Sequence, residues 1–96
     1  MEISFHPLVK RDFAEAFTYY RGISVNLANE FDHEVRFVLT QLTLNPARFH
    51  LVDQGFRRAN LRRFPFHILY EVDAEKLRVM RIGHNKRHPD YGRGRK

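Results

Sequence analysis

At 96 residues and 43% hydrophobic composition, the chain can bury one core but not two, and this composition argues against wholesale disorder. The lack of cysteine excludes disulfides and cysteine-ligated zinc. We see no signal peptide and no apolar run of the roughly 18–20 residues that a membrane helix needs. We therefore expect a single cytoplasmic domain over residues 1–96, with no membrane partner. The net charge of +6 is uneven: residues 1–54 carry five basic and seven acidic side chains, whereas residues 55–96 carry twelve basic and four acidic ones, which favours an anionic partner for the second half.

The N-terminal part predicts a short strand followed by a helix. Residues 2–5 alternate polar and apolar side chains, which favours a strand. Pro7 then fits the first turn of a helix, where its missing N–H is not needed. Apolar side chains recur at helical spacing on one face, at Val9, Phe13, Ala16, Phe17 and Tyr20. We expect this helix to end at Gly22.

A second helix is expected directly after the first. Ser24 suits its N-cap, because a serine hydroxyl accepts a hydrogen bond from the first helical turn. Apolar positions spaced by three or four form its buried stripe, at Leu27, Phe31, Val35, Val38 and Leu42. Asn45 and Pro46 stop the helix. The two amphipathic helices therefore form a helical hairpin.

The second half of the chain predicts strands. After a loop over residues 46–55 the apolar period changes from helical to alternating. Phe64-Pro65 separates the first strand segment from the next, because proline cannot donate to a strand ladder. Residues 66–72 form the next strand, a turn follows at residues 73–76, and the last strand covers residues 77–83.

The last strand indicates how the sheet is built. It has apolar residues at both parities, namely Leu77, Val79, Met80 and Ile82. We therefore expect it to be central and covered on both sides. The predicted fold is α+β, with a short N-terminal strand, a helical hairpin and then a three-stranded antiparallel meander.

This pattern resembles the RelE/ParE superfamily, the small toxins of bacterial type II toxin–antitoxin pairs. The most specific features are the run from Leu61 to Tyr70, which reads LRRFPFHILY, and the ending formed by His84, Arg87 and Tyr91. The similarity covers nearly the whole chain. It implies a RelE/ParE-like fold and a hetero-oligomer with a cognate antitoxin. Members differ in target: some cut mRNA on the ribosome, ParE-type members poison DNA gyrase, and others have no settled target.

In the ribonuclease members, basic residues on the middle strands and a tyrosine near the C-terminus share the chemistry. Cleavage through the 2′-hydroxyl needs a base, cations around the phosphate and an acid for the leaving oxygen, so no metal is required. Asn60 stands where that pattern has a lysine, and His67 stands where it has an arginine. The spacing from Arg87 to Tyr91 is also shorter than in that pattern. The matching positions are Arg58, Arg62, Arg87 and, approximately, Tyr91.

The resemblance makes Arg87, Tyr91, Arg62 and His67 the expected catalytic residues. Arg87 is expected to clamp the scissile phosphate, since a guanidinium offers a bidentate fork. Tyr91 is expected to act as a base or as a platform on which a base stacks, unless it only holds the tail against the sheet. The expected nucleic-acid-binding residues are Arg57, Arg58, Asn60, Arg81, His84 and Lys86.

No cofactor and no metal are expected. His84 and His88 are four residues apart, a metal-ligand spacing in a helix, but Pro89 follows and no cluster of carboxylates accompanies them. The cationic, glycine-rich tail over residues 91–96 is expected to be flexible until a partner binds it.

Three functions stay open at this point. The leading one is ribosome-dependent mRNA cleavage without a metal, with the ribosome and mRNA as partners. The alternative is inhibition of DNA gyrase, a protein-binding activity that Asn60, His67 and the short spacing before Tyr91 favour. The third is an inactive domain that only binds the antitoxin, because an intact fold does not guarantee activity. In each case an acidic amphipathic antitoxin would suit the basic half of the chain.

Overall fold

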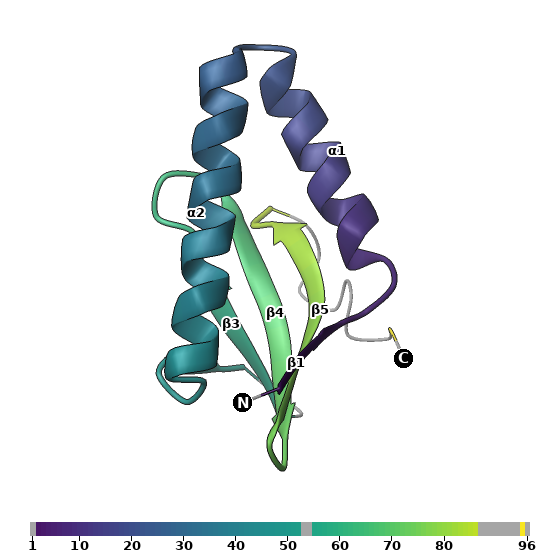
Figure 1. The fold of residues 1–96 in the computed structure, drawn as a ribbon, viewed down its shortest axis with the longest axis vertical. Coiled ribbons are helices and arrows are strands. Elements are labelled where there is room, and N and C mark those ends of the chain that lie inside the picture. The colour runs from purple at the N-terminus through teal and green to yellow at the C-terminus, as the bar shows by residue number, and fades with distance from the viewer. Residues whose placement is uncertain (1, 53–54, 87–94, 96) are drawn as a thin grey trace.

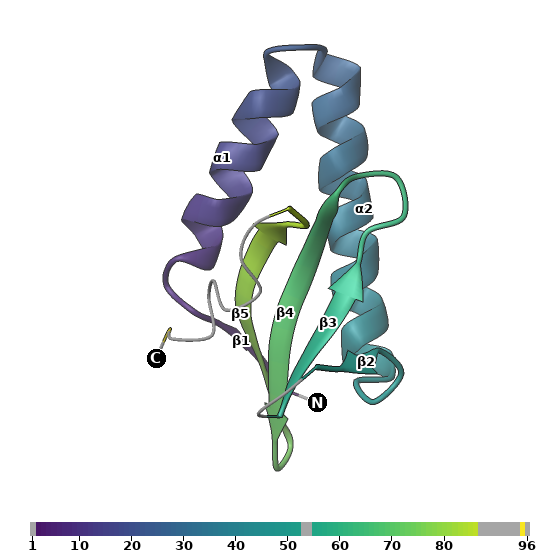
Figure 2. The ribbon, with the colours of Figure 1, turned by 180° about the vertical axis from the view of Figure 1, so that it is seen from behind.

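The computed structural model describes residues 2–52, 55–86 and 95, and it has two layers. Helices α1 (Val9–Arg21) and α2 (Val25–Leu44) form a hairpin that lies on one face of a five-stranded sheet (Figure 1). The second face of the sheet carries no helix among these residues, as the view from behind shows (Figure 2). No helix in the described ranges is long and apolar enough to cross a membrane.

The sheet contains the predicted meander and one strand on each side of it. Its spatial order is β1-β5-β4-β3-β2. Neighbouring strands pair antiparallel except β1, which lies parallel to β5 because the helical hairpin carries the chain back across the sheet. The strands are β1 (Glu2–Phe5), β2 (His50–Leu51), β3 (Phe56–Asn60), β4 (Phe66–Asp73) and β5 (Lys76–His84). The predicted α+β fold is therefore confirmed.

The predicted helix boundaries are confirmed with one difference at the start. The backbone N–H of Leu27 donates to Ser24 Oγ at 3.2 Å, so Ser24 is the N-cap of α2. Gly22 follows the last residue of α1, and its N–H donates to the carbonyl of Thr18. Pro7 lies in the turn before α1 rather than in its first turn, because the N-cap is Leu8.

The strand β2 was not predicted, since it lies inside the segment expected to be a loop. It contains only His50 and Leu51, which pair with Arg58 and Arg57 of β3. Two residues are too few to show an alternating pattern. This short strand forms the edge of the sheet beside β3.

The strand β5 is central, as predicted. A β-bulge explains why apolar residues occur at both odd and even positions of this strand. Leu69 of β4 pairs with Arg81, whereas the next residue, Tyr70, pairs with Val79, so Met80 is the extra residue. The bulge reverses the alternation, and Leu77, Val79 and Ile82 all join the core under the helices. Met80 packs instead with Phe56 and Leu69 in a smaller cluster on the second face. Among the described residues, the buried apolar cluster on that face consists of these three side chains.

An aromatic cluster joins the hairpin to the sheet. The ring of Phe64 lies 4.9 Å from Tyr20 of α1 and 5.3 Å from Phe31 of α2, both edge-to-face. The ring of Phe66, at the start of β4, lies 5.4 Å from Phe31. These contacts fix the loop before β4 beneath the hairpin, which places Pro65 and Phe66 opposite α1.

Candidate functional site

The predicted site residues lie in three separate places. Arg58, Asn60, His67 and Arg81 share the second face of the sheet, Arg57 and Arg62 face the helical side, and His84 and Lys86 line a cleft beside α1. Arg87 and Tyr91 lie outside the described residues.

Arg58 and Asn60 form the exposed part of the second face. Arg58 is half-buried and its Nε donates to Asn60 Oδ1 at 2.9 Å. Asn60 pairs across the ladder with His67, and His67 in turn pairs with Gly83 of β5. A short row of polar side chains therefore spans β3 and β4 on this face and ends at the backbone of Gly83 in β5.

His67 is buried in this row, with only 7% of its surface exposed. Its Nδ1 lies 2.8 Å from Asn85 Oδ1, and because an amide oxygen can only accept, the proton sits on Nδ1. Burial lowers the pKa of His67 to about 4, and the positive charges of Arg58 and Arg81 act in the same direction against the hydrogen bond to Asn85. At neutral pH His67 is therefore uncharged and is poorly suited to donate a proton to a leaving oxygen.

Arg81 is more deeply buried still, at 1% exposure. A Cβ built on Gly83 would lie 2.4 Å from Arg81 Cζ, so the guanidinium lies directly against the backbone of Gly83. Only glycine leaves room for that contact. Arg81 thus occupies a fixed place within the fold and does not extend into solvent.

Arg57 is held by the loop that follows α2. Its Nη1 donates to the carbonyls of Phe49 at 2.8 Å and Ala47 at 3.3 Å. The hydroxyl of Tyr70, its cross-strand partner, donates to the carbonyl of Pro46 at 2.7 Å, and burial raises the pKa of Tyr70. Arg57 and Tyr70 together attach this loop to the sheet.

Arg62 lies beyond the end of β3, in the loop that docks on α2. The backbone N–H groups of Arg62 and Arg63 both donate to the carboxylate of Glu34, at 2.9 and 3.1 Å. Nη2 of Arg63 also forms an ion pair with Glu30 at 2.8 Å. Arg62 and Arg58 both match the ribonuclease pattern, but the structure places Arg62 beside α2 and Arg58 on the second face of the sheet.

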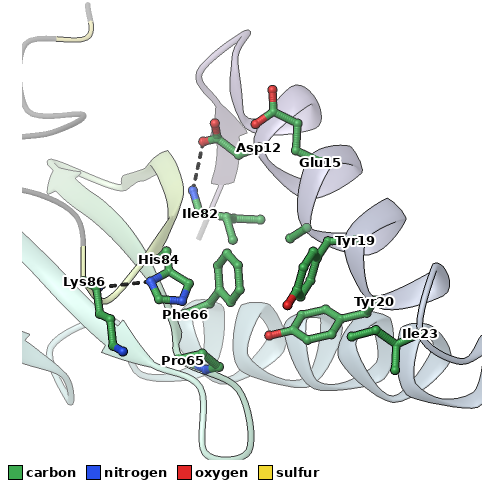
Figure 3. A pocket seen from close by; sticks show the side chains of 11 residues that line it. Asp12, Glu15, Tyr19, Tyr20, Ile23, Pro65, Phe66, Ile82, His84 and Lys86 are labelled. Carbon is green, nitrogen blue, oxygen red and sulfur yellow. Dashed lines mark hydrogen bonds between the residues drawn. The ribbon is translucent and has the colours of Figure 1, made fainter.

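His84 and Lys86 line a cleft of about 560 Å³ between α1 and the sheet, which we call the α1–β5 cleft (Figure 3). His84 packs edge-to-face on Phe66, with ring centroids 5.1 Å apart, so it faces the helices and not the side of His67. Helix α1 contributes Asp12, Glu15, Ala16, Tyr19 and Tyr20, and the turn after it contributes Ile23. The sheet side contributes Pro65, Phe66, Ile82, His84 and Lys86.

Asp12 closes one end of this cleft and was not predicted as a functional residue. Its Oδ2 accepts from the backbone N–H of Ile82 at 3.1 Å and from Nη1 of Arg95 at 2.7 Å. Asp12 follows Val9 by three residues and so falls within the apolar stripe of α1, where a carboxylate is unusual. A carboxylate within the apolar stripe was the sequence signal that could have identified Asp12. Among the described residues no three side chains of the His, Asp and Glu types gather as a metal site requires.

The chain matches one protein family over most of its length. The sequence model described as "ParE toxin of type II toxin-antitoxin system, parDE" matches residues 3–89. A chain of a solved structure described as "Chromosomal ParDE TA system from P. aeruginosa" superposes with a TM-score of 0.74 and 17% identity, over 88% of this chain and 95% of that chain, which shows a shared fold. No curated protein matches it. With the strand–hairpin–meander fold in place and the family match spanning residues 3–89, the chain belongs to the ParE toxins of type II toxin–antitoxin systems.

Proposed function

We propose that this toxin inhibits DNA gyrase by binding it, and that a cognate antitoxin keeps the toxin inactive in the cytoplasm. The membership in the ParE family supports this target, since ParE-type members of the superfamily poison gyrase. The solved structure with the same fold comes from a ParDE toxin–antitoxin system, which supports an antitoxin partner in a hetero-oligomer.

The observation that carries the proposal is that the described basic residues do not converge on one phosphate. Arg57 is bonded to backbone carbonyls, Arg62 lies over α2, and Arg81 is buried in the sheet. His67 is neutral at physiological pH, because its pKa is about 4. RNA cleavage without a metal needs several cations and a proton donor around one phosphate. A protein-binding toxin has no such requirement.

One observation favours the other candidate, ribosome-dependent mRNA cleavage. Arg58, Asn60 and His67 share one face, where Arg58 and Asn60 reach solvent. Cleavage on that face would further require Arg87 as the phosphate clamp and Tyr91 as the base. In this reading Arg87→Ala abolishes toxicity and leaves antitoxin binding intact.

A supercoiling assay tests the proposal directly. Purified toxin is added to gyrase, ATP and relaxed plasmid, and supercoiling should fall with toxin concentration, while added antitoxin restores it. In cells, brief induction should cause a DNA-damage response and filamentation with intact messages. Normal supercoiling together with new mRNA 5′ ends inside reading frames would overturn the gyrase target and establish the ribonuclease.

A further inference from the structure

We propose that a hollow beside the start of α1 binds a small monocarboxylate with an apolar body, of the class of the medium-chain fatty acids. We call this place the His6 hollow, after the side chain that would donate a hydrogen bond to the carboxylate. The proposal concerns a ligand site of the toxin itself and depends neither on the gyrase target nor on the antitoxin.

The His6 hollow lies where the two helices separate. Helices α1 and α2 diverge from the hairpin turn toward the start of α1, as both views show (Figures 1 and 2). The hollow is lined by both helices and has a volume of about 420 Å³, within the range of about 300–1,000 Å³ that small-molecule sites occupy. Most of its lining is apolar, including Val9, Phe13, Val35, Leu39 and Ile82. An apolar body placed there would lose its contact with water on most sides.

Helix α1 separates the His6 hollow from the α1–β5 cleft. Val9 and Phe13 of this helix line the hollow, whereas Asp12 and Tyr19 line the cleft. Ile82 of β5 borders both. The hollow and the cleft are therefore different sites on different sides of α1.

His6 supplies a hydrogen-bond donor to this apolar space. The residue lines the hollow and is only 8% exposed. Its Nδ1 accepts from the backbone N–H of Leu8 at 3.1 Å, so the proton of the neutral ring sits on Nε2. Nε2 forms no hydrogen bond within the described ranges, yet it is not a fully buried atom, so part of its surface reaches solvent. A nearly buried ring therefore keeps an N–H available to a ligand.

The position of this ring is fixed by the backbone around it. The N–H of His6 donates to the carbonyl of Val79 at 2.8 Å, which continues the contact of β1 with β5 beyond Phe5. The carbonyl of His6 accepts from the N–H of Val9 at 3.0 Å, at the start of α1. Because the ring is also bonded to Leu8, it needs little rearrangement to donate to a ligand.

The charges at the hollow favour a single negative group. Arg36 and Asp32 line it on the side of α2 and form an ion pair at 2.9 Å. Lys10 lines it on the side of α1, is exposed and forms no ion pair with any described residue. One unpaired cation beside one N–H donor matches a carboxylate, whereas phosphate groups and nucleic acids call for several arginines or lysines. The apolar lining then selects a carboxylate that carries a hydrocarbon chain.

The length and the head group of the ligand are varied first. Purified toxin is titrated calorimetrically with butanoate, hexanoate and octanoate. We expect saturable binding whose affinity rises about fourfold for each methylene that is added and buried. Octanoate should bind about tenfold more tightly than 1-octanol, because a charged acceptor forms the stronger hydrogen bond. The absence of saturable octanoate binding, or equal affinities for octanoate and 1-octanol, would overturn the proposal.

Two variants then locate the carboxylate. His6→Asn keeps an oxygen that can accept from Leu8 but lacks Nε2, and Lys10→Gln removes the charge. We expect His6→Asn to raise the Kd for octanoate about tenfold. Lys10→Gln should raise it about two- to fivefold at low salt and have no effect at high salt. The matched controls His33→Asn and Lys76→Gln change exposed positions outside the hollow and should leave the Kd unchanged. A Kd that His6→Asn leaves at the wild-type value contradicts the role of His6.

An NMR titration of the wild type gives an answer even if His6→Asn folds poorly. As octanoate is added, the Nε2 resonance of His6 and the methyl resonances of Val9 and Val35 should shift. The methyl resonances of Ile23, which lines the α1–β5 cleft, should stay in place. Shifts at Ile23 with none at His6 would put octanoate in the cleft and refute the assignment of the hollow.

Discussion

Arg95 and Asp12 are 83 positions apart in the chain and form a two-armed ion pair, with Nη1 2.7 Å from Oδ2 and Nη2 3.1 Å from Oδ1. Both side chains are buried, at 12% and 9% exposure. The same guanidinium donates to the carbonyl of Met80 at 2.9 Å, and the same carboxylate accepts from the N–H of Ile82. The pair therefore provides hydrogen-bond partners for backbone groups of β5 after Val79, the residue at which the pairing of β5 with β1 ends.

Removal of one partner of this pair should destabilise the fold strongly. Asp12→Ala removes the two-armed ion pair with the Arg95 guanidinium and the acceptor of the Ile82 N–H, which costs about 3–5 kcal/mol of the free energy of unfolding. Urea denaturation at neutral pH measures the change. Glu15→Ala is the matched control, because Glu15 pairs with Arg11 on the exposed side of the same helix and should contribute less than about 1 kcal/mol. Equal losses in the two variants would show that the Arg95 pair does not hold α1 to the sheet.

The buried His67 should make stability depend on pH below neutrality. Its pKa is about 4 in the folded protein and near 6.5 in the unfolded chain, so between these values the unfolded state binds more protons. The contribution of His67 is complete above about pH 6.5 and is lost as the pH falls toward 4, by about 3 kcal/mol in total. Denaturation of the wild type and of His67→Gln at several pH values measures the difference. An NMR titration that places the pKa of His67 near 6.5 would contradict this prediction.

Gly83 should tolerate no side chain while Arg81 keeps its position. In Gly83→Ala the new methyl group would lie 2.4 to 2.6 Å from the Arg81 guanidinium, so this buried group must move, and we expect a loss of about 1–3 kcal/mol. The double variant with Arg81→Ala removes the obstacle. The loss caused by Gly83→Ala should then be smaller in that background, as a double-mutant cycle by thermal denaturation would show. If the two changes in the free energy of unfolding were strictly additive, the Arg81 guanidinium would not lie against Gly83.

The sequence predicted most of the fold because its signals are local. The stripes of α1 and α2, the N-cap at Ser24 and the break at Phe64-Pro65 each depend on neighbours a few residues apart. The bulge at Met80 could not be predicted, since it appears only when β4 pairs with β5. Both parities of β5 were apolar for that reason, and the pattern alone did not distinguish a bulge from a strand covered on both sides.

The candidate site was harder to predict because it depends on which face each basic side chain takes. Arg57 and Arg58 are adjacent in sequence, yet one bonds the loop after α2 and the other lies beside Asn60 on the second face. The α1–β5 cleft joins residues of α1 with residues of β5 that lie more than sixty positions further along. Contacts between residues so far apart in the chain produce no recognisable pattern of spacing in the sequence. Neither the cleft nor the ion pair of Arg95 with Asp12 was therefore predicted.

The same substitution at the two neighbouring arginines of β3 should change stability by different amounts. Arg57→Met loses the hydrogen bonds to the carbonyls of Ala47 and Phe49, so the free energy of unfolding should fall by about 1–2 kcal/mol. Arg58→Met loses one half-exposed bond to Asn60 and should change stability by less than about 0.5 kcal/mol. Chemical denaturation of both variants measures this difference, and a larger loss for Arg58 would contradict the assignment of the faces. Toxicity on induction adds a second readout, since a stable Arg58→Met protein that no longer stops growth would favour the ribonuclease face over gyrase binding.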